Sequence, residues 1–316
     1  MTNAPPGYSV RAATWDDIDA VGKLLVAADL ADLGEQDFFI EELQDDWRQP
    51  QLDMATDTWL VKSNGEACAY TWLLGRNSHR DLDSWGVVHP AHRGRGLGRF
   101  LLERVERRAA EHGALVPAGE GAKLLFHTLA VDGAARELLL GRRFDLVRHF
   151  WRMDIEIENA PPSPQSVEGI SIRAFRRDQD ERPVYEAFEE AFADHFGYVP
   201  RSFEDWSTMR LKEGFDPSLW LVATEGPEVV GALAGRIMEG IGWVETLGVR
   251  EKWRGRGIGE ALLRHAFPEF HRRGITRSSL NVDSTNETGA VALYERVGMH
   301  VARQYDTYEK RFGTPA

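Results

Sequence analysis

The hydrophobic positions of the chain follow two periods, and the succession of elements that they predict occurs twice. Alternating apolar and polar residues predict strands, whereas apolar residues spaced three and four apart predict helices. In the first half the predicted strands cover 8–12, 59–62, 67–74 and 84–88, and the predicted helices cover about 15–28 and 97–112. In the second half the strands cover 170–174, 220–224, 229–237 and 243–249, and the helices cover about 182–194 and 258–273. A further strand, helix and strand are predicted to close each half.

Three pairs of similar segments indicate that the two halves are copies of one plan. Arg93 and Arg254 occupy the same place in HRGRGLGRFLL and WRGRGIGEALL, 161 positions apart. TWLV at 58–61 and LWLV at 219–222 have the same offset of 161, and SVRA at 9–12 and SIRA at 171–174 are offset by 162. Because the pairs keep their order at a nearly constant offset, we interpret the chain as a tandem duplication.

The duplication divides the chain into two predicted domains. The segment 158–169 is rich in Pro, Ser and Gly and has no apolar period, so we interpret it as a linker between domains at 1–157 and 170–316. Strands with helices between them predict an α/β fold. Each domain is expected to hold a mixed, partly parallel sheet flanked by helices.

The composition narrows the class of protein. A net charge of −12 argues against binding to nucleic acid or to an anionic membrane surface. Cys68 is the only cysteine, so no disulfide within the chain is possible and a reducing, cytoplasmic location is expected. No apolar run is long enough to cross a bilayer, and no basic and apolar leader pattern opens the sequence. No metal-ligand spacing is present either, and the chain is compatible with a monomer or a homodimer.

Both copies carry a glycine-rich loop between a predicted strand and a predicted helix. Glycines at every second position let the backbone turn sharply, with its N–H groups converging at a helix N-terminus where the helix dipole favours an anion. The loop therefore predicts a pyrophosphate cradle, with a tight turn and solvated arginines as the alternative interpretation. The dinucleotide-binding spacing G-x-G-x-x-G and the P-loop G-K-[ST] are both absent.

The loop resembles motif A of the GNAT superfamily of acetyl-CoA-dependent N-acyltransferases, R-x-x-G-x-G/A after a strand. NVDSTNETGAVALYERVGM at 281–299 resembles the next motif of that superfamily, and the tandem layout resembles the mycothiol synthase family. The resemblance implies acetyl-CoA as co-substrate and a splayed strand near 247–249 that aims an N–H at the thioester carbonyl. In copy two it implies cofactor contacts from Leu247, Gly248, Val249, Arg254, Gly255, Arg256, Gly257, Ile258, Gly259, Asn286, Gly289 and Ala290. In copy one the corresponding contacts are Val88, Arg93, Gly94, Arg95, Gly96, Leu97 and Gly98.

The two copies differ in the groups that aminolysis of a thioester needs, which are a base for the amine and an acid for the leaving thiolate. Strand alternation places Glu245 on one face with Trp243 and Leu247, inside the cleft, as a candidate general base. The superfamily resemblance implies that Tyr294 is the general acid. The offset of 161 places Ser84 opposite Glu245, and aligning Arg143 with Gly298 places Leu139 opposite Tyr294 in copy one. Copy two is therefore predicted to be catalytic and copy one to be degenerate, binding CoA or only shaping the cleft.

The acceptor is predicted to be a primary amine on a small molecule. Candidate contacts are Asp194, His195, Tyr198, Arg236 and Asn281, where Arg236 corresponds to a substrate-binding lysine in the mycothiol synthase family. That family carries its cleft glutamate two residues earlier, where this chain has Trp243, which argues against an identical substrate. Acetylation of a cysteinyl-aminosugar conjugate, acetylation of a protein amine and a non-catalytic CoA-sensing role are the alternatives. A non-catalytic binder has no use for both Glu245 and Tyr294.

Overall fold

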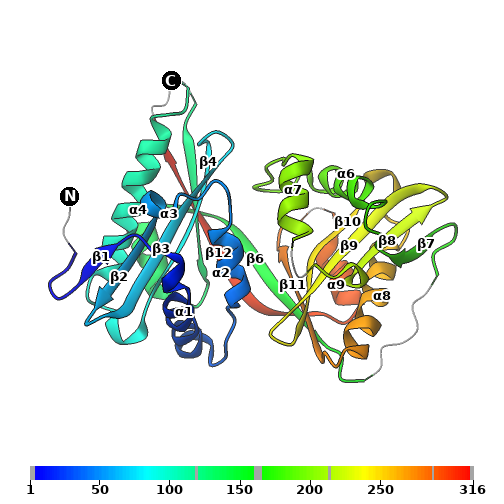
Figure 1. Ribbon diagram of the computed structural model, residues 1–316, viewed down its shortest axis with the longest axis horizontal. Helices are drawn as coiled ribbons and strands as arrows, with labels where there is room; N and C mark the ends of the chain where they lie inside the picture. Colours follow the sequence, from blue (N-terminus) through cyan, green and yellow to red (C-terminus); the bar gives the residue numbers. More distant parts are fainter. Residues whose placement is uncertain (1–3, 118–119, 160–165, 213–214, 287, 314–316) are drawn as a thin grey trace. The chain divides into compact units, whose positions relative to one another are not determined.

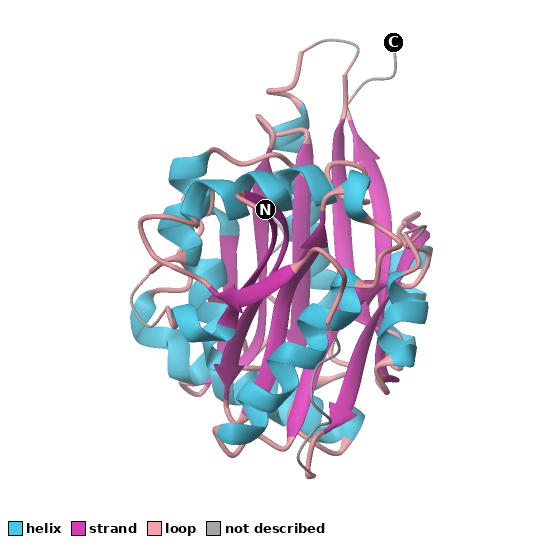
Figure 2. Cartoon of the chain, turned by 90° about the vertical axis from the view of Figure 1, so that its right-hand side faces the viewer, coloured by secondary structure: helices cyan, strands magenta, loops and turns pink. Residues whose placement is uncertain are grey.

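The computed structural model describes residues 4–117, 120–159, 166–212, 215–286 and 288–313, and the chain divides into two compact units. Unit 1 comprises Met1–His149 with Gln304–Ala316, and unit 2 comprises Phe150–Arg303. Each unit has one mixed sheet with helices against its faces, which confirms the predicted α/β class (Figures 1 and 2). Within the predicted linker, residues 160–165 lie outside the described residues.

The sheet of unit 1 has one parallel pair at the place where a helix crosses over. Its strands, in spatial order, are β1 (Ser9–Arg11), β2 (Thr58–Ser63), β3 (Glu66–Arg76), β4 (Asp81–Val88), β5 (Ala122–Leu129) and β12 (His300–Phe312). Its helices are α1 (Ile18–Leu33), α2 (Ile40–Trp47), α3 (Met54–Asp57), α4 (Leu97–Gly113) and α5 (Gly133–Gly141). Strands β4 and β5 run parallel because α4 carries the chain back across the sheet, whereas β5 and β12 run antiparallel.

Unit 2 repeats this plan. Its strands, in spatial order, are β6 (Asp145–Glu156), β11 (Arg277–Asp283), β10 (Ile241–Val249), β9 (Glu228–Met238), β8 (Trp220–Glu225) and β7 (Ser171–Ala174). Its helices are α6 (Glu181–Phe192), α7 (Phe203–Arg210), α8 (Ile258–Arg272) and α9 (Ala290–Arg296). Helix α8 is the crossover between the parallel strands β10 and β11. The predicted strand before each glycine loop and the helix after it are confirmed (Figure 1).

The closing strand of each sheet does not follow the division into two contiguous domains that the sequence predicts. Residues 305–312 of β12 pair with β5 of unit 1, although they follow all of unit 2 in the chain. Residues 150–156 of β6 pair with β11 of unit 2. The cores explain this assignment, because Tyr308 is fully buried beside Leu124 in unit 1 and Met153 is fully buried beside Leu280 in unit 2. The boundary therefore falls inside β6 and β12 rather than in the Pro-rich segment.

Apolar residues cover both faces of the sheet in unit 2. On one face Leu262 and Phe270 of α8 pack against Val244 and Leu280. On the other face Phe188 of α6 and Trp206 of α7 pack with Trp220 and Val222 of β8. The sheet thus separates two layers of helices. The carboxyl ends of β10 and β11 line a cavity beside the loop that precedes α8. This end of the sheet is where the glycine loop and the predicted catalytic residues meet.

A buried carboxyl in unit 1 gives a prediction about stability. The indole N–H of Trp85 donates to Asp46 at 3.4 Å, and burial raises the pKa of Asp46 to about 6. The folded state therefore binds this proton more tightly than the unfolded state. The resulting stabilisation is complete at low pH and is lost as the pH rises from the ordinary value of 3.8 through about 6.

We therefore expect Asp46→Asn to raise the free energy of unfolding by about 2 to 3 kcal/mol at pH 8, and to have little effect near pH 4. The asparagine oxygen still accepts the Trp85 N–H, so the hydrogen bond is kept. Urea unfolding followed by tryptophan fluorescence at both pH values measures the difference. Asp19→Asn, which changes an exposed carboxylate of α1, is the control and is expected to change little. An effect of Asp46→Asn that is equal at both pH values contradicts the prediction.

Candidate active site

A cavity of about 510 Å³ in unit 2 brings together most of the residues predicted for copy two. It lies against β10 and β11, the end of α6, and the starts of α8 and α9. The predicted residues that line it are His195, Tyr198, Glu245, Leu247, Gly248, Val249, Arg254, Gly255, Gly257, Ile258, Gly259, Asn281, Asn286, Gly289, Ala290 and Tyr294. Asp194, Arg236 and Arg256 are outside the lining. Asp194 is exposed to solvent, and the Arg256 guanidinium turns away to pair with Glu225 at 2.9 Å.

The glycine loop has the geometry of an anion cradle. Gly255 and Gly257 have φ values of +75° and +82°, in the left-handed region that favours glycine, and Gly257 is the N-cap of α8. A Cβ placed on Gly257 meets no heavy atom within 4 Å, so the space in front of the helix N-terminus is open. Arg254 holds the loop in place by donating to the carbonyl oxygens of Val249 at 3.2 Å and Ala191 at 3.1 Å. The residues present therefore fit a pyrophosphate group.

A β-bulge sets the direction of Glu245. Val244 pairs with Gly235 and Thr246 pairs with Ala234, so Glu245 is an extra residue in β10. A bulge of this kind turns two successive side chains toward the same face of the sheet. Arg210 of α7 contacts both, with Nη1 3.3 Å from Glu245 Oε2 and Nη2 3.4 Å from Thr246 Oγ1.

The bulge corrects one expectation from the sequence. Leu247 packs with the α8 core on the opposite face, so it does not share a face with Glu245. The predicted splay is a separate feature on the β11 side, where β10 pairs with β11 only at 241–243 and the two strands have parted by 247–249. Gly248 has a different role, since a Cβ there lies 3.0 Å from Ala191 Cβ and from Phe188 Cδ1. Glycine at this position lets α6 pack closely on β10.

Glu245 is held between two guanidinium groups. Its Oε2 faces Arg210 and its Oε1 lies 3.3 Å from Nη1 of Arg236, which extends from β9. The carboxylate side chain is 19% exposed and lines the cavity. Arg236, expected as a lining residue, therefore acts on the cavity through Glu245. Arg210 and Thr246 were missed by the sequence reasoning, because no local pattern connects α7 with β10.

Tyr294 lies at the inner end of the same cavity. Its ring packs in the core with Leu262 and Val297, and burial raises the pKa of its hydroxyl to about 12. Among the residues that the structure describes, none accepts or donates a hydrogen bond at this hydroxyl. A buried phenol of raised pKa stays protonated at neutral pH, so it can donate a proton to a group in the cavity.

Two of the predicted acceptor residues, His195 and Tyr198, are each hydrogen-bonded to another side chain. Nε2 of His195 lies 3.1 Å from Nδ2 of Asn286, and burial together with the charge of Arg254 lowers the pKa of the imidazole. The Tyr198 hydroxyl donates to Glu189, and burial and this carboxylate raise the pKa of the phenol. His195 is therefore neutral at neutral pH, and it lines the cavity together with Tyr198, Asn286 and the aromatic rings of Phe192 and Phe196.

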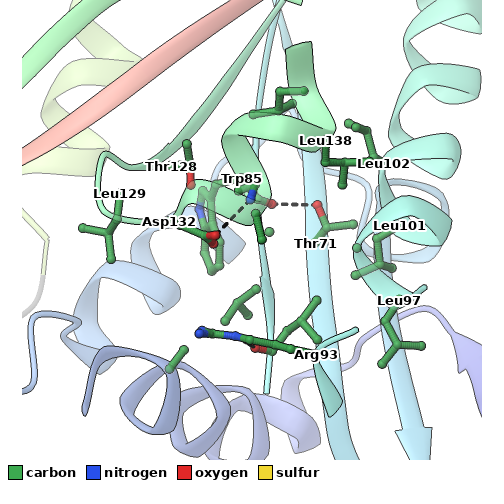
Figure 3. Close-up of a pocket in the computed structure, with 18 of the residues that line it drawn as sticks. Thr71, Trp85, Arg93, Leu97, Leu101, Leu102, Thr128, Leu129, Asp132 and Leu138 are labelled. Atoms are coloured by element: carbon green, nitrogen blue, oxygen red, sulfur yellow. Dashed lines mark hydrogen bonds between the residues drawn. The ribbon is translucent and has the colours of Figure 1, made fainter. Parts of the chain in front are cut away.

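Unit 1 has a corresponding cavity of about 430 Å³ (Figure 3). The predicted residues that line it are Val88, Arg93, Gly94, Gly96, Leu97 and Gly98. Arg95 is outside the lining and donates to the Tyr8 hydroxyl at 3.3 Å. Figure 3 shows Leu97, Leu101 and Leu102 of α4 along one side of this cavity.

The first cavity lacks counterparts of both predicted catalytic groups. Strand β4 pairs with β3 without a register shift, and Ser84 is fully buried with its hydroxyl donating to the Trp72 carbonyl. Leu139 takes the place of Tyr294, since Phe144 N donates to Leu139 O as Met299 N donates to Tyr294 O. Tyr305 of β12 also lines this cavity, and its hydroxyl donates to Asp37. The first cavity thus has a phenol, that of Tyr305, but this side chain extends from β12 instead of the helix that carries Leu139, and its hydroxyl is hydrogen-bonded to Asp37.

The loop arginines of the two copies also differ in their partners. Both arginines donate to the carbonyl of the preceding strand, Val88 or Val249. Arg93 also forms a bidentate pair with Asp32 at 2.5 and 2.7 Å, whereas the hydrogen bonds of Arg254 within the described residues all go to backbone carbonyls. Asp32 follows Ala28 at the same spacing as His195 follows Ala191, and all four line their cavities. The Asp32 carboxylate therefore neutralises the motif arginine of the first cradle, which in the second cradle contacts backbone carbonyl oxygens.

In the described part of the chain, no helix is long and apolar enough to cross a membrane. Within the same residues, no group of three or more His, Cys, Asp or Glu side chains could hold a metal ion.

Comparisons with known proteins agree with this geometry. The profile of the Acetyltransferase (GNAT) family matches residues 25–118 and 178–299, once in each unit. A mycothiol acetyltransferase of Thermobispora bispora is 34% identical over 219 residues, which are 67% of this chain and 70% of that protein. A mycothiol acetyltransferase of Streptomyces coelicolor is 28% identical over 288 residues, covering 90% of this chain and 89% of that protein.

Solved structures show the same fold over the whole chain. A GCN5-related N-acetyltransferase from Sphaerobacter thermophilus has a TM-score of 0.85 at 38% identity, covering 98% of this chain and 97% of that one. A tandem GNAT protein from the clavulanic acid biosynthesis pathway has a TM-score of 0.75 at 16% identity, covering 96% and 98%. At 16% identity, the similarity to the second structure shows that the two chains share the tandem fold, and nothing further.

Because the profile covers more than half of the chain, the chain belongs to the GNAT acetyltransferase family. Its relatives and its tandem layout, which resembles mycothiol synthase, make it an N-acetyltransferase that uses acetyl-CoA as co-substrate. The enzymatic interpretation of the sequence is thereby confirmed.

Proposed function

We propose that unit 2 transfers the acetyl group of acetyl-CoA to a primary amine of a small molecule. The observation that carries this proposal is that Glu245 and Tyr294 line the same cavity as the open cradle at Gly257. Unit 1 has neither group at the corresponding place. The cradle residues hold the pyrophosphate of acetyl-CoA, whose thioester supplies an activated acyl group.

In this proposal each residue has one role in the transfer. Glu245 accepts the proton of the attacking amine, directly or through a water, so that the nitrogen lone pair can form the new C–N bond. The C–S bond then breaks, and the Tyr294 hydroxyl protonates the departing thiolate. His195 and Asn281 line the wall beside these groups and position the acceptor.

Unit 1 is proposed to be non-catalytic. Its cradle keeps the glycines that accept a phosphate, and the Asp32 carboxylate on Arg93 makes it the weaker of the two CoA sites. The relatives named mycothiol acetyltransferase make acetylation of a cysteinyl-aminosugar conjugate the second candidate reaction. The changed cleft, with Trp243 and Arg236 at positions that differ from that family, favours another amine.

The test is release of free thiol from acetyl-CoA in the presence of a panel of small primary amines. Glu245→Gln is expected to lower the rate about 10²- to 10⁴-fold at a pH below the pKa of the amine. The rate recovers as the pH rises and the free amine becomes abundant. Steady-state rates from pH 6 to pH 10 for the parent and the variant measure this. A Glu245→Gln variant that matches the parent at every pH excludes Glu245 as the base.

A further inference from the structure

The Arg210 guanidinium lies beside two residues that line the second cavity and is not saturated by them. Arg210 is the last residue of α7, and its contacts with Glu245 and Thr246 are 3.3 and 3.4 Å long. Each contact is single and uses one N–H, whereas a guanidinium has five N–H donors. The side chain is 29% exposed, and no other partner of the guanidinium is present among the residues that the structure describes.

Arginines that serve the fold of this unit pair differently. Arg173 forms a bidentate pair with Asp180 at 2.5 and 2.7 Å, and that carboxylate is also bound by the N–H of Arg176. A bidentate pair of this kind uses both carboxylate oxygens on one guanidinium. Glu245 instead offers one oxygen each to Arg210 and Arg236, at longer distances. The Arg210 guanidinium therefore reaches the cavity-lining Glu245 through a single contact and is not held by a bidentate carboxylate.

The first copy shows that the fold does not need this cluster. Leu74 pairs with Asp83 across β3 and β4 as Arg236 pairs with Trp243 across β9 and β10. Leu74 is buried in an apolar core, and β4 has no bulge and hence no counterpart of Glu245. The same sheet thus folds with an apolar side chain at this position, and the charged cluster is particular to the unit that carries the cradle and Tyr294.

We propose that the acceptor amine carries an anionic group, a carboxylate or a phosphate, and that Arg210 binds this group. The inference rests on the proposed function of unit 2. Glu245 faces the amine, and Arg210, 3.3 Å from the same carboxylate, faces the anion on the adjoining part of the molecule. An α-amino acid carries both groups on one carbon, and a phosphorylated aminosugar carries them several bonds apart, so the two compounds test a short and a long separation. A guanidinium fork matches either anion through two parallel N–H donors.

The experiment compares each anionic amine with its uncharged partner in the thiol-release assay. The pairs are an amino acid with its amide, and glucosamine 6-phosphate with glucosamine. We expect the parent to favour the anionic member of one pair by about 10- to 100-fold in kcat/KM, the range of a charged hydrogen bond. The pair that shows the preference distinguishes the carboxylate from the phosphate.

Variants separate anion binding from the positioning of Glu245. Arg210→Gln is expected to abolish the preference mainly by raising KM for the anionic member, and Arg210→Lys to keep part of it. Arg272→Gln, which removes an exposed arginine paired with Glu269, is the control and leaves the preference unchanged. The affinity for acetyl-CoA, measured by calorimetry, reports that each variant is folded.

Two results overturn the inference. In one, the parent uses the charged and uncharged members of both pairs equally well. In the other, Arg210→Gln lowers the rate equally for both members, which would make Arg210 a positioning residue for Glu245. If the parent releases no thiol with any amine, the proposed function itself fails, and the inference falls with it.

Discussion

Replacing Gly257 by aspartate is expected to abolish acetyl-CoA binding in unit 2 and, with it, turnover. The added side chain has room, since a Cβ at this position meets nothing within 4 Å. Its carboxylate stands at the N-terminus of α8, where the pyrophosphate must lie, and repels it. A like-charge contact costs several kcal/mol, so calorimetry is expected to show a loss of affinity of roughly 100-fold or more.

The structure offers matched controls for this variant. Gly257→Asn adds a side chain of the same size at the same φ of +82° but without the charge, so it isolates the electrostatic effect. Gly96→Asp places the carboxylate in the first cradle, where φ is also +82°, and is expected to leave turnover in place. If Gly96→Asp abolishes turnover in a folded protein while Gly257→Asp does not, the active unit is the first one.

The features that could be predicted from the sequence are those carried by short segments. The loop glycines were predictable because a left-handed turn before a helix leaves few other residues possible, and their spacing is local. The duplication was predictable because three pairs of similar segments keep their offset. The place of Leu139 was also predictable by counting from Arg143, which adopts a φ of +63° where Gly298 has +99°.

The features that could not be predicted depend on pairing between distant strands. The bulge at Glu245 exists only relative to Gly235 and Ala234 of β9, so an alternating pattern cannot reveal it. The assignment of β12 to unit 1 depends on Tyr308 packing with Leu124 in the core of that unit. The alternation of apolar residues along β12 would be the same if the strand packed in unit 2, so the sequence pattern does not distinguish the two. Arg210 joined the candidate site through such tertiary contacts alone.

The site also shows why similar loops need not give similar sites. Arg93 and Arg254 occupy the same motif position, yet Asp32 neutralises the first whereas the second donates to the carbonyl oxygens of Val249 and Ala191. The difference comes from the residue four positions after the cavity-lining Ala28 or Ala191, outside the motif. The charge of a phosphate cradle is therefore set by the helix packed beside the loop as much as by the loop.

Tyr294→Phe is expected to lower kcat about 10²- to 10⁴-fold with little change in the affinity for acetyl-CoA. The ring is packed in the core, so phenylalanine keeps the packing and removes only the hydroxyl. Since burial raises the pKa of this hydroxyl to about 12, it stays protonated from pH 7 to pH 10. The loss is therefore expected to be constant over that range. Single-turnover rates with a saturating amine measure the chemical step directly.

Tyr198→Phe is the matched control, because it removes another hydroxyl from the same cavity, one that is already bound to Glu189. It is expected to change KM for the amine far more than it changes kcat. The assignment of Tyr294 as the acid fails if Tyr294→Phe keeps the parent's single-turnover rate. It fails equally if the loss disappears toward pH 10. The hydroxyl of the parent is still protonated at that pH, so its removal must still lower the rate. A loss that is constant with pH, specific to kcat and absent from Tyr198→Phe is the result that proton donation to the thiolate requires.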